Sequence, residues 1–176
     1  SIQYLESKIK KLSLFLSLMV LSLSFAFGQQ TEKPKIYNEE ANPKVDIANA
    51  VQKASAEKKH VLLQIGGNWC AWCIMFDKLT KENQEVKDYI ANNYEVVHVN
   101  YSPKNKNEET LAALNHPERF GFPVFVILDG KGNLIHTQNS GYLESKEVKG
   151  HDPKVVLEFL QNWSYKALDP ASYIKK

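Results

Sequence analysis

Two cysteines are the residues of this chain whose type and spacing could do chemistry. Cys70 and Cys73 are the only cysteines among its 176 residues, and two residues separate them. A cysteine is a nucleophile only as its thiolate, and in Cys-x-x-Cys motifs the pKa of the thiol is commonly lowered to roughly 3.5–7.5. One thiol of such a pair can attack a foreign disulfide, and the other can then resolve the mixed disulfide. The spacing therefore favours thiol–disulfide exchange.

Three other uses of the two thiols compete with this one. Structural zinc needs about four protein ligands, but the chain has no second cysteine pair and its five histidines show no ligand spacing. Haem attachment needs a histidine directly after the second cysteine, where this chain has Ile74. A purely structural disulfide would close a very short loop, which restricts the unfolded chain least. We therefore expect a redox-active pair, with no metal and no organic cofactor.

The sequence on either side of the pair predicts a strand that leads into a helix. The apolar run 60–65 precedes the motif, and the helix-compatible run 74–79 follows it. A helix that begins near Cys70 would place that sulfur beside free backbone N–H groups and the positive end of the helix dipole, both of which favour a thiolate. Cys73 would then lie about one turn further along, on the same face.

Helices and strands alternate along the rest of the chain. The apolar patterns, caps and turn residues predict helix 43–58, strand 60–66, two helices that meet at Asn83, strand 94–100, short helix 110–114, strand 124–128, turn 129–133, strand 134–138 and a final helix from Pro153 to Trp163. Strands that alternate with helices and end in a hairpin indicate an α/β fold, with a central mixed β-sheet and helices on both faces.

The N-terminal segment has the features of a secretory signal peptide. Within residues 1–28, the polar stretch 1–11 contains three lysines, the uncharged run 12–27 follows it, and small residues stand at Ala26 and Gly28. As a helix that run would span about 24 Å, which is shorter than a hydrocarbon core of about 30 Å. We expect cleavage near Gly28 and a periplasmic or secreted protein, with an uncleaved membrane anchor as the alternative. Disulfides persist in those compartments.

The other segments define the domain boundaries, and the balance of charges bears on the choice of partners. Residues 29–42 are polar and predict a flexible lead-in, 43–163 form the folded domain, and 164–176 form a C-terminal tail. The chain has 22 Lys and Arg against 20 Asp and Glu, and Arg119 is its only arginine. Because no basic patch is present, we do not expect nucleic acid as a partner.

From about residue 43 to residue 163, the sequence resembles the thioredoxin superfamily. One motif that carries the resemblance is Trp69-Cys70-Ala71-Trp72-Cys73 directly after a strand. The other is the segment 120–132, with Phe122-Pro123 before a strand and a hairpin, which resembles the cis-proline region of that family. A tryptophan between the cysteines is similar to exported bacterial thioredoxin-like proteins.

The resemblance implies a thioredoxin fold and a role for each motif residue. Cys70 would be the attacking thiolate and Cys73 the resolving thiol. Pro123 would form a cis peptide bond with Phe122 beside both sulfurs, where the open backbone could pair with an extended substrate. Trp69, Trp72 and Phe122 would offer apolar contacts to an unfolded client. We expect Trp72 to be the more exposed tryptophan, and core packing is the alternative for Trp69.

Two departures from thioredoxin bear on the chemistry. Thioredoxin has a buried acid on the preceding strand, six residues before its first cysteine, but this chain has Gln64 there, which cannot accept a proton. His98 on the next strand is a candidate proton relay, and a half-exposed strand histidine without such a role is the alternative. Ala71-Trp72 replaces the Gly-Pro of thioredoxin, so neither redox direction is excluded.

The residues and the resemblance together predict an exported thiol–disulfide oxidoreductase of thioredoxin fold. We expect it to act as a reductase on client proteins that carry disulfides, and to receive electrons from a membrane-linked thiol donor. Two other classes stay open. One is a client-binding or chaperone module with little turnover, and the other is a thiol helper in cytochrome maturation or metal handling.

Overall fold

The computed structural model describes residues 2–4, 6, 8 and 34–174. The chain divides into two compact units, residues 1–33 and 34–176, and the fold below is that of the second. The predicted signal peptide, 1–28, lies outside the described residues except for 2–4, 6 and 8, so it stays a prediction. No helix within the described part of the chain is long and apolar enough to cross a membrane.

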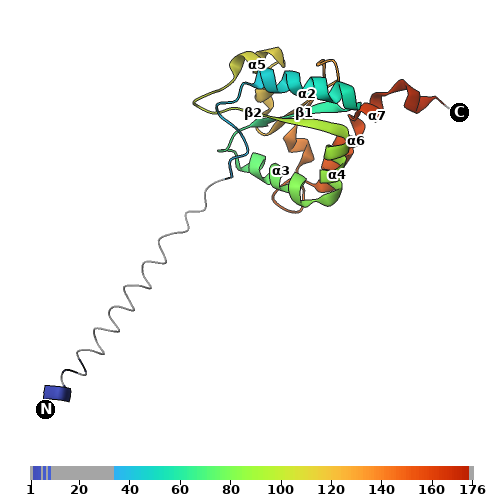
Figure 1. The fold of residues 1–176 in the computed structure, drawn as a ribbon. Helices are drawn as coiled ribbons and strands as arrows, with labels where there is room; N and C mark the ends of the chain where they lie inside the picture. Colours follow the sequence, from blue (N-terminus) through green and yellow to red (C-terminus); the bar gives the residue numbers. More distant parts are fainter. Residues whose placement is uncertain (1, 5, 7, 9–33, 175–176) are drawn as a thin grey trace. The chain divides into compact units, whose positions relative to one another are not determined.

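A four-stranded mixed sheet forms the centre of the domain (Figure 1). Its strands are β1 (His60–Gly66), β2 (Tyr94–Asn100), β3 (Val124–Leu128) and β4 (Leu134–Asn139), and their order is β2-β1-β3-β4. β1 runs parallel to β2 and antiparallel to β3, and β3 pairs with β4 as a hairpin. This is the mixed sheet that the sequence predicts.

The two inner strands are buried along their whole length. Successive side chains of a strand point to opposite faces, so Val61, Leu63 and Ile65 enter one core cluster while Leu62 enters the other. Because both faces are covered, these strands read as continuous apolar runs rather than as an alternation with polar residues.

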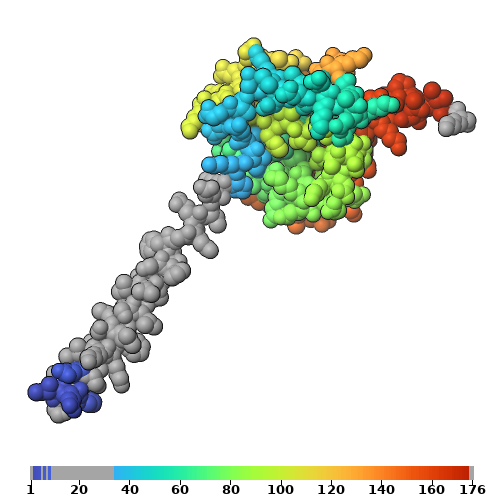
Figure 2. All heavy atoms as spheres, in the orientation of Figure 1, coloured from blue at the N-terminus to red at the C-terminus, as the bar shows by residue number. Residues whose placement is uncertain are grey.

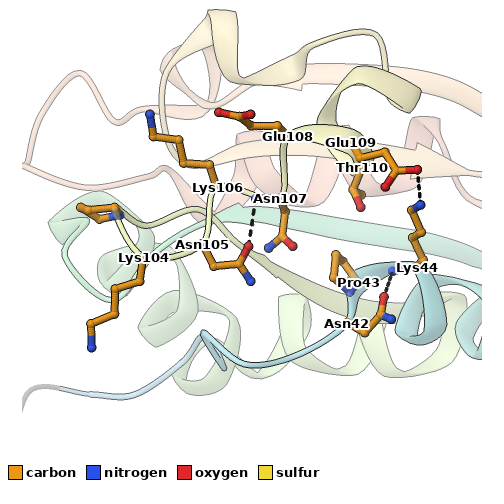
Figure 3. Close-up of a pocket in the computed structure, with 11 residues that line it drawn as sticks. Asn42, Pro43, Lys44, Lys104, Asn105, Lys106, Asn107, Glu108, Glu109 and Thr110 are labelled. Carbon is orange, nitrogen blue, oxygen red and sulfur yellow. Dashed lines mark hydrogen bonds and ion pairs between the residues drawn. The ribbon is translucent and has the colours of Figure 1, made fainter.

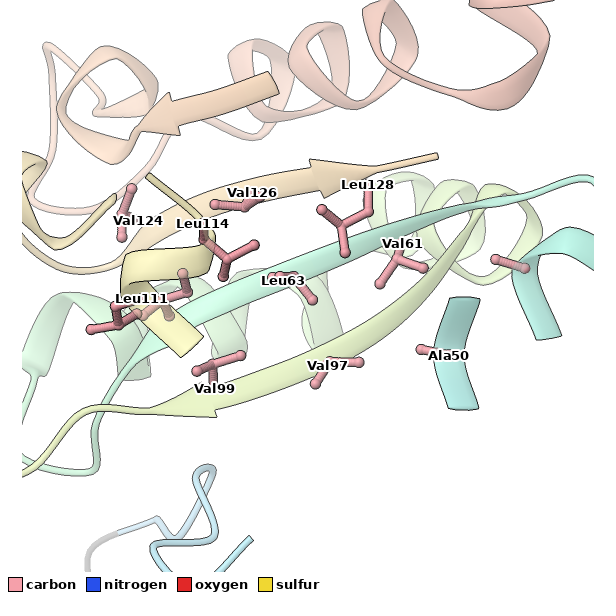
Figure 4. Close-up of a cluster of buried hydrophobic side chains, with 12 residues drawn as sticks. Ala50, Val61, Leu63, Val97, Val99, Leu111, Leu114, Val124, Val126 and Leu128 are labelled. Carbon is pink, nitrogen blue, oxygen red and sulfur yellow. The ribbon is translucent and has the colours of Figure 1, made fainter. Parts of the chain in front are cut away.

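Helices α2 (Pro43–Glu57) and α5 (Glu108–Ala113) cover one face of the sheet. Figure 4 shows side chains of both helices meeting those of β1, β2 and β3. α2 begins where the sequence predicts, because the Asn42 side chain accepts a hydrogen bond from the Lys44 N–H and Pro43 occupies the first helical position.

Helices α3 (Ala71–Glu82), α4 (Gln84–Asn93) and α6 (Pro153–Asn162) cover the opposite face. The two layers are visible in Figure 1, and in Figure 2 as the cyan surface of α2 and the green surface of α3 and α4. Asn83 separates α3 from α4, since its side chain accepts a hydrogen bond from the Val86 N–H. The predicted helices on both faces are therefore confirmed.

The region after α6 has more structure than a tail. It forms α7 (Tyr165–Leu168) and the short 3₁₀ helix η3 (Pro170–Tyr173). Each begins with a capping side chain, Ser164 for α7 and Asp169 for η3. These caps are local hydrogen bonds that do not depend on a long apolar pattern, which is why a search for periodicity in the sequence passes over them. The residues of both helices are exposed or half-buried.

Candidate active site

Cys70 and Cys73 form a disulfide at the N-terminus of α3. Cys70 is the N-cap residue, with an extended backbone, and its Sγ accepts a hydrogen bond from the Cys73 N–H at 3.1 Å. The Cα atoms of the two cysteines are 5.2 Å apart. The sulfur of Cys70 is therefore held where the free N–H groups and the dipole of the helix favour negative charge.

The two sulfurs differ in their access to solvent. Cys70 is 5% exposed, whereas Cys73 is completely buried. Thiol–disulfide exchange requires the attacking or attacked sulfur to be reached by its partner. Of the pair, only Cys70 offers any surface to another protein.

The segment before β3 lies beside the disulfide. Ile65 pairs with Val124, so the end of β1 and the residues just before β3 are neighbours across the sheet. The Phe122–Pro123 peptide bond is cis, in agreement with the sequence prediction, and Pro123 is buried. Phe122 packs against the cluster that contains both cysteines.

Aromatic side chains lie beside the cysteine motif. Trp69 is 54% exposed, and its Nε1–H donates a hydrogen bond to the Tyr101 carbonyl oxygen at 2.7 Å. Phe122 contacts both rings, with centroid distances of 5.6 Å to Trp69 and 4.6 Å to Tyr101. These three residues form an aromatic patch next to the motif.

The prediction for the two tryptophans was wrong. Trp72 is half-buried, and its ring meets His151 edge to face at a centroid distance of 5.4 Å. Trp69 is the exposed one, because its hydrogen bond to Tyr101 holds it at the surface. The sequence does not reveal this order, since His151 lies 79 positions after Trp72.

Gly66 ends β1 directly below the disulfide. A Cβ atom at this position would overlap Cys73 Sγ and would lie 2.8 Å from the Tyr37 hydroxyl oxygen. Both distances are shorter than real Cβ contacts. The sulfur and the phenol therefore occupy this space only because residue 66 has no side chain.

The lead-in predicted to be flexible over 29–42 is fixed to the active-site motif in its described part. The Asn68 Oδ1 accepts hydrogen bonds from the Ile36 and Tyr37 N–H groups at 2.8 and 2.9 Å, and its Nδ2 donates to the Tyr37 carbonyl at 2.8 Å. Tyr37 is only 3% exposed and packs against both cysteines. An apolar pair, Ile36-Tyr37, inside a polar segment was the signal that could have indicated this.

Gln64 and Tyr37 form a buried polar pair beneath Cys73. The Gln64 Nε2 donates a hydrogen bond to the Tyr37 hydroxyl oxygen at 3.1 Å. Burial raises the pKa of Tyr37 above its usual range, and the charge of Asp77 adds to this effect while the Gln64 hydrogen bond opposes it. The phenol therefore keeps its proton at neutral pH. Gln64 is the residue six positions before Cys70, where the resemblance places the buried acid of thioredoxin.

His98 reaches the cysteines through Tyr37. It lies opposite Gln64 in the β1–β2 register, and its ring meets that of Tyr37 edge to face at 5.5 Å. Its Nε2 is 4.0 Å from Asp77 Oδ1. Burial lowers the pKa of His98, the charge of Asp77 opposes this shift and that of Lys81 adds to it. A cavity of about 230 Å³ between the sheet, α3 and α4 is lined in part by Gln64, Asp77, Lys81 and His98.

The remaining described surface adds no second chemical centre. Over residues 2–4, 6, 8 and 34–174, no three His, Cys, Asp or Glu side chains are grouped so as to hold a metal ion. A polar hollow of about 610 Å³ is lined by 42–44 and 103–110, without either cysteine. Figure 3 shows that its lining carries lysine, asparagine and glutamate side chains, including the Lys44–Glu109 ion pair.

A family model described as thioredoxin-like matches residues 41–130, and the chain belongs to this family. It is 26% identical over 145 residues to the thiol:disulfide interchange protein DsbD of Actinobacillus pleuropneumoniae serotype 5b (strain L20), which covers 78% of this chain and 24% of the relative. It is 26% identical over 94 residues to the disulfide bond reductase DsbH of Chlamydia pneumoniae, covering 50% of this chain and 57% of the relative.

A solved structure supports the same assignment. The disulphide isomerase from Xylella fastidiosa Temecula1 is 25% identical to this chain with a TM-score of 0.64, covering 73% of this chain and 96% of the other. The chain spans less than two thirds of the length of the two curated relatives. It thus has the fold and the cysteine pair of a thioredoxin-like thiol–disulfide oxidoreductase.

Proposed function

We propose that this protein exchanges disulfides with client proteins and works as a reductase. The observation that carries the proposal is the unequal access of the two cysteines: Cys70, the N-cap of α3, is 5% exposed, whereas Cys73 is completely buried. This difference in access suits Cys70 for the attack on a client disulfide and Cys73 for the release of the reduced client. The names of the relatives, an interchange protein, a reductase and an isomerase, support exchange but leave its direction open.

The proposed reaction has two steps. The Cys70 thiolate attacks a client disulfide, so that the client S–S bond breaks, a mixed disulfide forms and one client sulfur leaves and takes up a proton. The Cys73 thiol then loses its proton and attacks the Cys70 sulfur, which breaks the mixed disulfide and releases the second client thiol. Two electrons pass to the client, and the pair ends as a disulfide. A membrane-linked thiol donor would restore the dithiol.

The client would bind along the aromatic patch and the edge at Pro123. Proline has no N–H to donate, so an extended client segment could pair with the free backbone there in the manner of strand addition. Trp69 and Phe122 would contact its apolar side chains, and Trp72 would contribute less because it is half-buried.

The exchange reaction would take place in the periplasm or outside the cell, since residues 1–28 have the features of a signal peptide.

Reduction of insulin disulfides in the presence of dithiothreitol tests the proposal. The parent protein should accelerate the reaction, and both Cys70→Ser and Cys73→Ser should return it to the uncatalysed rate. The two variants control for each other, because only Cys73→Ser, reduced and then mixed with insulin after dithiothreitol has been removed, should accumulate a covalent client adduct that dithiothreitol later releases. An adduct on Cys70→Ser instead would reverse the proposed order of attack.

The redox potential of the pair, measured against glutathione, tests the direction. A value nearer the roughly −270 mV of thioredoxin than the roughly −120 mV of a strong oxidant would support a reductase.

The second candidate function is client binding without turnover, which the large exposed fraction of Trp69 favours. A parent protein that holds unfolded clients but never cycles with dithiothreitol would establish it.

A further inference from the structure

In the proposed reaction, Cys73 must lose its proton before it attacks, and no side chain has yet been assigned to assist this step. Its sulfur is completely buried, and burial disfavours a charged thiolate unless a hydrogen bond or a charge compensates. The residue beneath it is Gln64, whose amide cannot take up a proton. A hydrogen bond donated to the sulfur would stabilise the thiolate and so assist this step.

Tyr37 is the polar side chain placed to do so. Its hydroxyl oxygen and Cys73 Sγ lie against the same side of Gly66, in the space that a Cβ would fill. The oxygen accepts its hydrogen bond from Gln64, which directs the hydroxyl hydrogen away from the amide. Among the described residues, no hydrogen-bond acceptor is found for that hydrogen in the oxidised pair.

We propose that the Tyr37 hydroxyl donates a hydrogen bond to the Cys73 sulfur when the pair is reduced, and so favours the thiolate that releases the client. The role rests on the proposed exchange reaction. Gln64 orients the hydroxyl, and Asn68 holds the backbone of Tyr37 in place through its three hydrogen bonds. The lead-in thereby becomes part of the active site.

The charges around Tyr37 fit a donor rather than a base. Burial raises the pKa of the phenol, so it keeps its proton, and the proton of Cys73 passes to water. His98 on β2 faces the ring and has a lowered pKa, so it is neutral near pH 7. Asp77 and Lys81 on α3 lie beyond His98 and pair with each other at 2.7 Å.

The test isolates Cys73 as the single thiol in Cys70→Ser protein and follows its ionisation from pH 5 to 10 by the ultraviolet absorbance of the thiolate, which needs no reagent to reach the buried sulfur. Each protein is read against the matching variant that also carries Cys73→Ser, so that the tyrosines cancel. Adding Tyr37→Phe keeps the ring and removes one donor, and it should shift the midpoint upward by about one pH unit, which is about tenfold less thiolate near pH 7. Tyr142→Phe, at a side chain that is 78% exposed, should leave the midpoint in place.

Two further variants separate the outcomes. Asn68→Ala should shift the midpoint in the same direction by releasing the lead-in, and it replaces Tyr37→Phe if that protein is not folded by circular dichroism. Unchanged midpoints in both, or a shift found only in His98→Gln, would overturn the proposal in favour of no relay or of His98. Failure of the parent to reduce insulin would refute the proposed function, while the ionisation midpoints of Cys73 would still be measurable.

Discussion

At the scale of single residues, Gly66 is the point where the strand, the disulfide and the lead-in meet. The sulfur of Cys73 and the hydroxyl of Tyr37 both occupy the volume in which any other residue would place its Cβ. Protein interiors are packed closely enough that such a volume cannot be shared. The absence of one side chain is therefore a structural requirement of the oxidised site.

Gly66→Ala tests this requirement. The added methyl group overlaps Cys73 Sγ, so the oxidised protein should lose about 1–3 kcal/mol of unfolding free energy, the usual cost of overpacking. The reduced protein should lose less, because separated sulfurs can rotate away. Urea unfolding in both redox states measures the difference. Gly141→Ala is the control, since its Cβ would meet only the Asn139 side chain, at 3.2 Å, and lies far from the cysteines in the sequence. Equal losses in the two states would contradict the argument.

Residue-level prediction from the sequence succeeded where one local pattern carries the information. The placement of the two cysteines and of Pro123 follows from a short motif and its flanking strands. Tyr37 and Asn68 were missed because their contact joins positions 31 residues apart through backbone groups. Such a contact leaves no periodicity, and a polar stretch without periodicity reads as flexible.

At the scale of elements, the connection between β4 and α6 is held against the first turns of α3. His151 in this connection bridges back to Glu144, and its ring packs edge to face on Trp72 and Phe76. Both of its ring nitrogens are buried without a hydrogen-bond partner. A charged imidazole in this place would be costly, since nothing compensates its burial.

The stability of the protein should therefore fall in mild acid. Burial lowers the pKa of His151 from 6.5 to about 4, so unfolded chains take up this proton before folded ones. The stability that comes from keeping His151 neutral is fully present above about pH 6.5 and is lost as the pH falls towards 4. The unfolding free energy should fall by at most about 3 kcal/mol over this range. Denaturant unfolding at pH 4.5 and 7.5 should show the loss, and His151→Leu should reduce it.

His116→Asn is the matched control, because the His116 side chain is exposed and asparagine tolerates its left-handed backbone. This variant should keep the pH dependence of the parent. An identical pH dependence in His151→Leu would show that other groups cause the acid sensitivity.

Elements with a strong pattern were predicted nearly to the residue. β1, β2 and β3 have the predicted bounds, since polar residues or turns mark both ends of each apolar run. The short helices η1 (Pro117–Phe120), η2 (Ser140–Leu143), α7 and η3 were not predicted. Helices of one turn depend on local caps and on tertiary packing, which sequence periodicity does not report.

At the scale of the whole molecule, one sheet supports two cores and one reactive edge. Helices on both faces bury the inner strands, and the motif leaves β1 at the end where the Pro123 segment enters β3. The fold class could be predicted because alternating strands and helices allow few arrangements. The order of exposure of the tryptophans could not, since it depends on which distant side chains each ring meets.

The position of Trp72 predicts that the fluorescence of the protein depends on its oxidation state. Its ring packs against the cluster of Cys70 and Cys73, whereas Trp163 stacks on His136 at a centroid distance of 4.0 Å. A disulfide quenches a neighbouring excited indole by accepting an electron from it, and a dithiol does so far less. Emission should therefore brighten when dithiothreitol is added, and this change should shrink in Trp72→Phe but persist in Trp163→Phe. A fluorescence titration could then follow the oxidation state of the cysteine pair in the unlabelled protein.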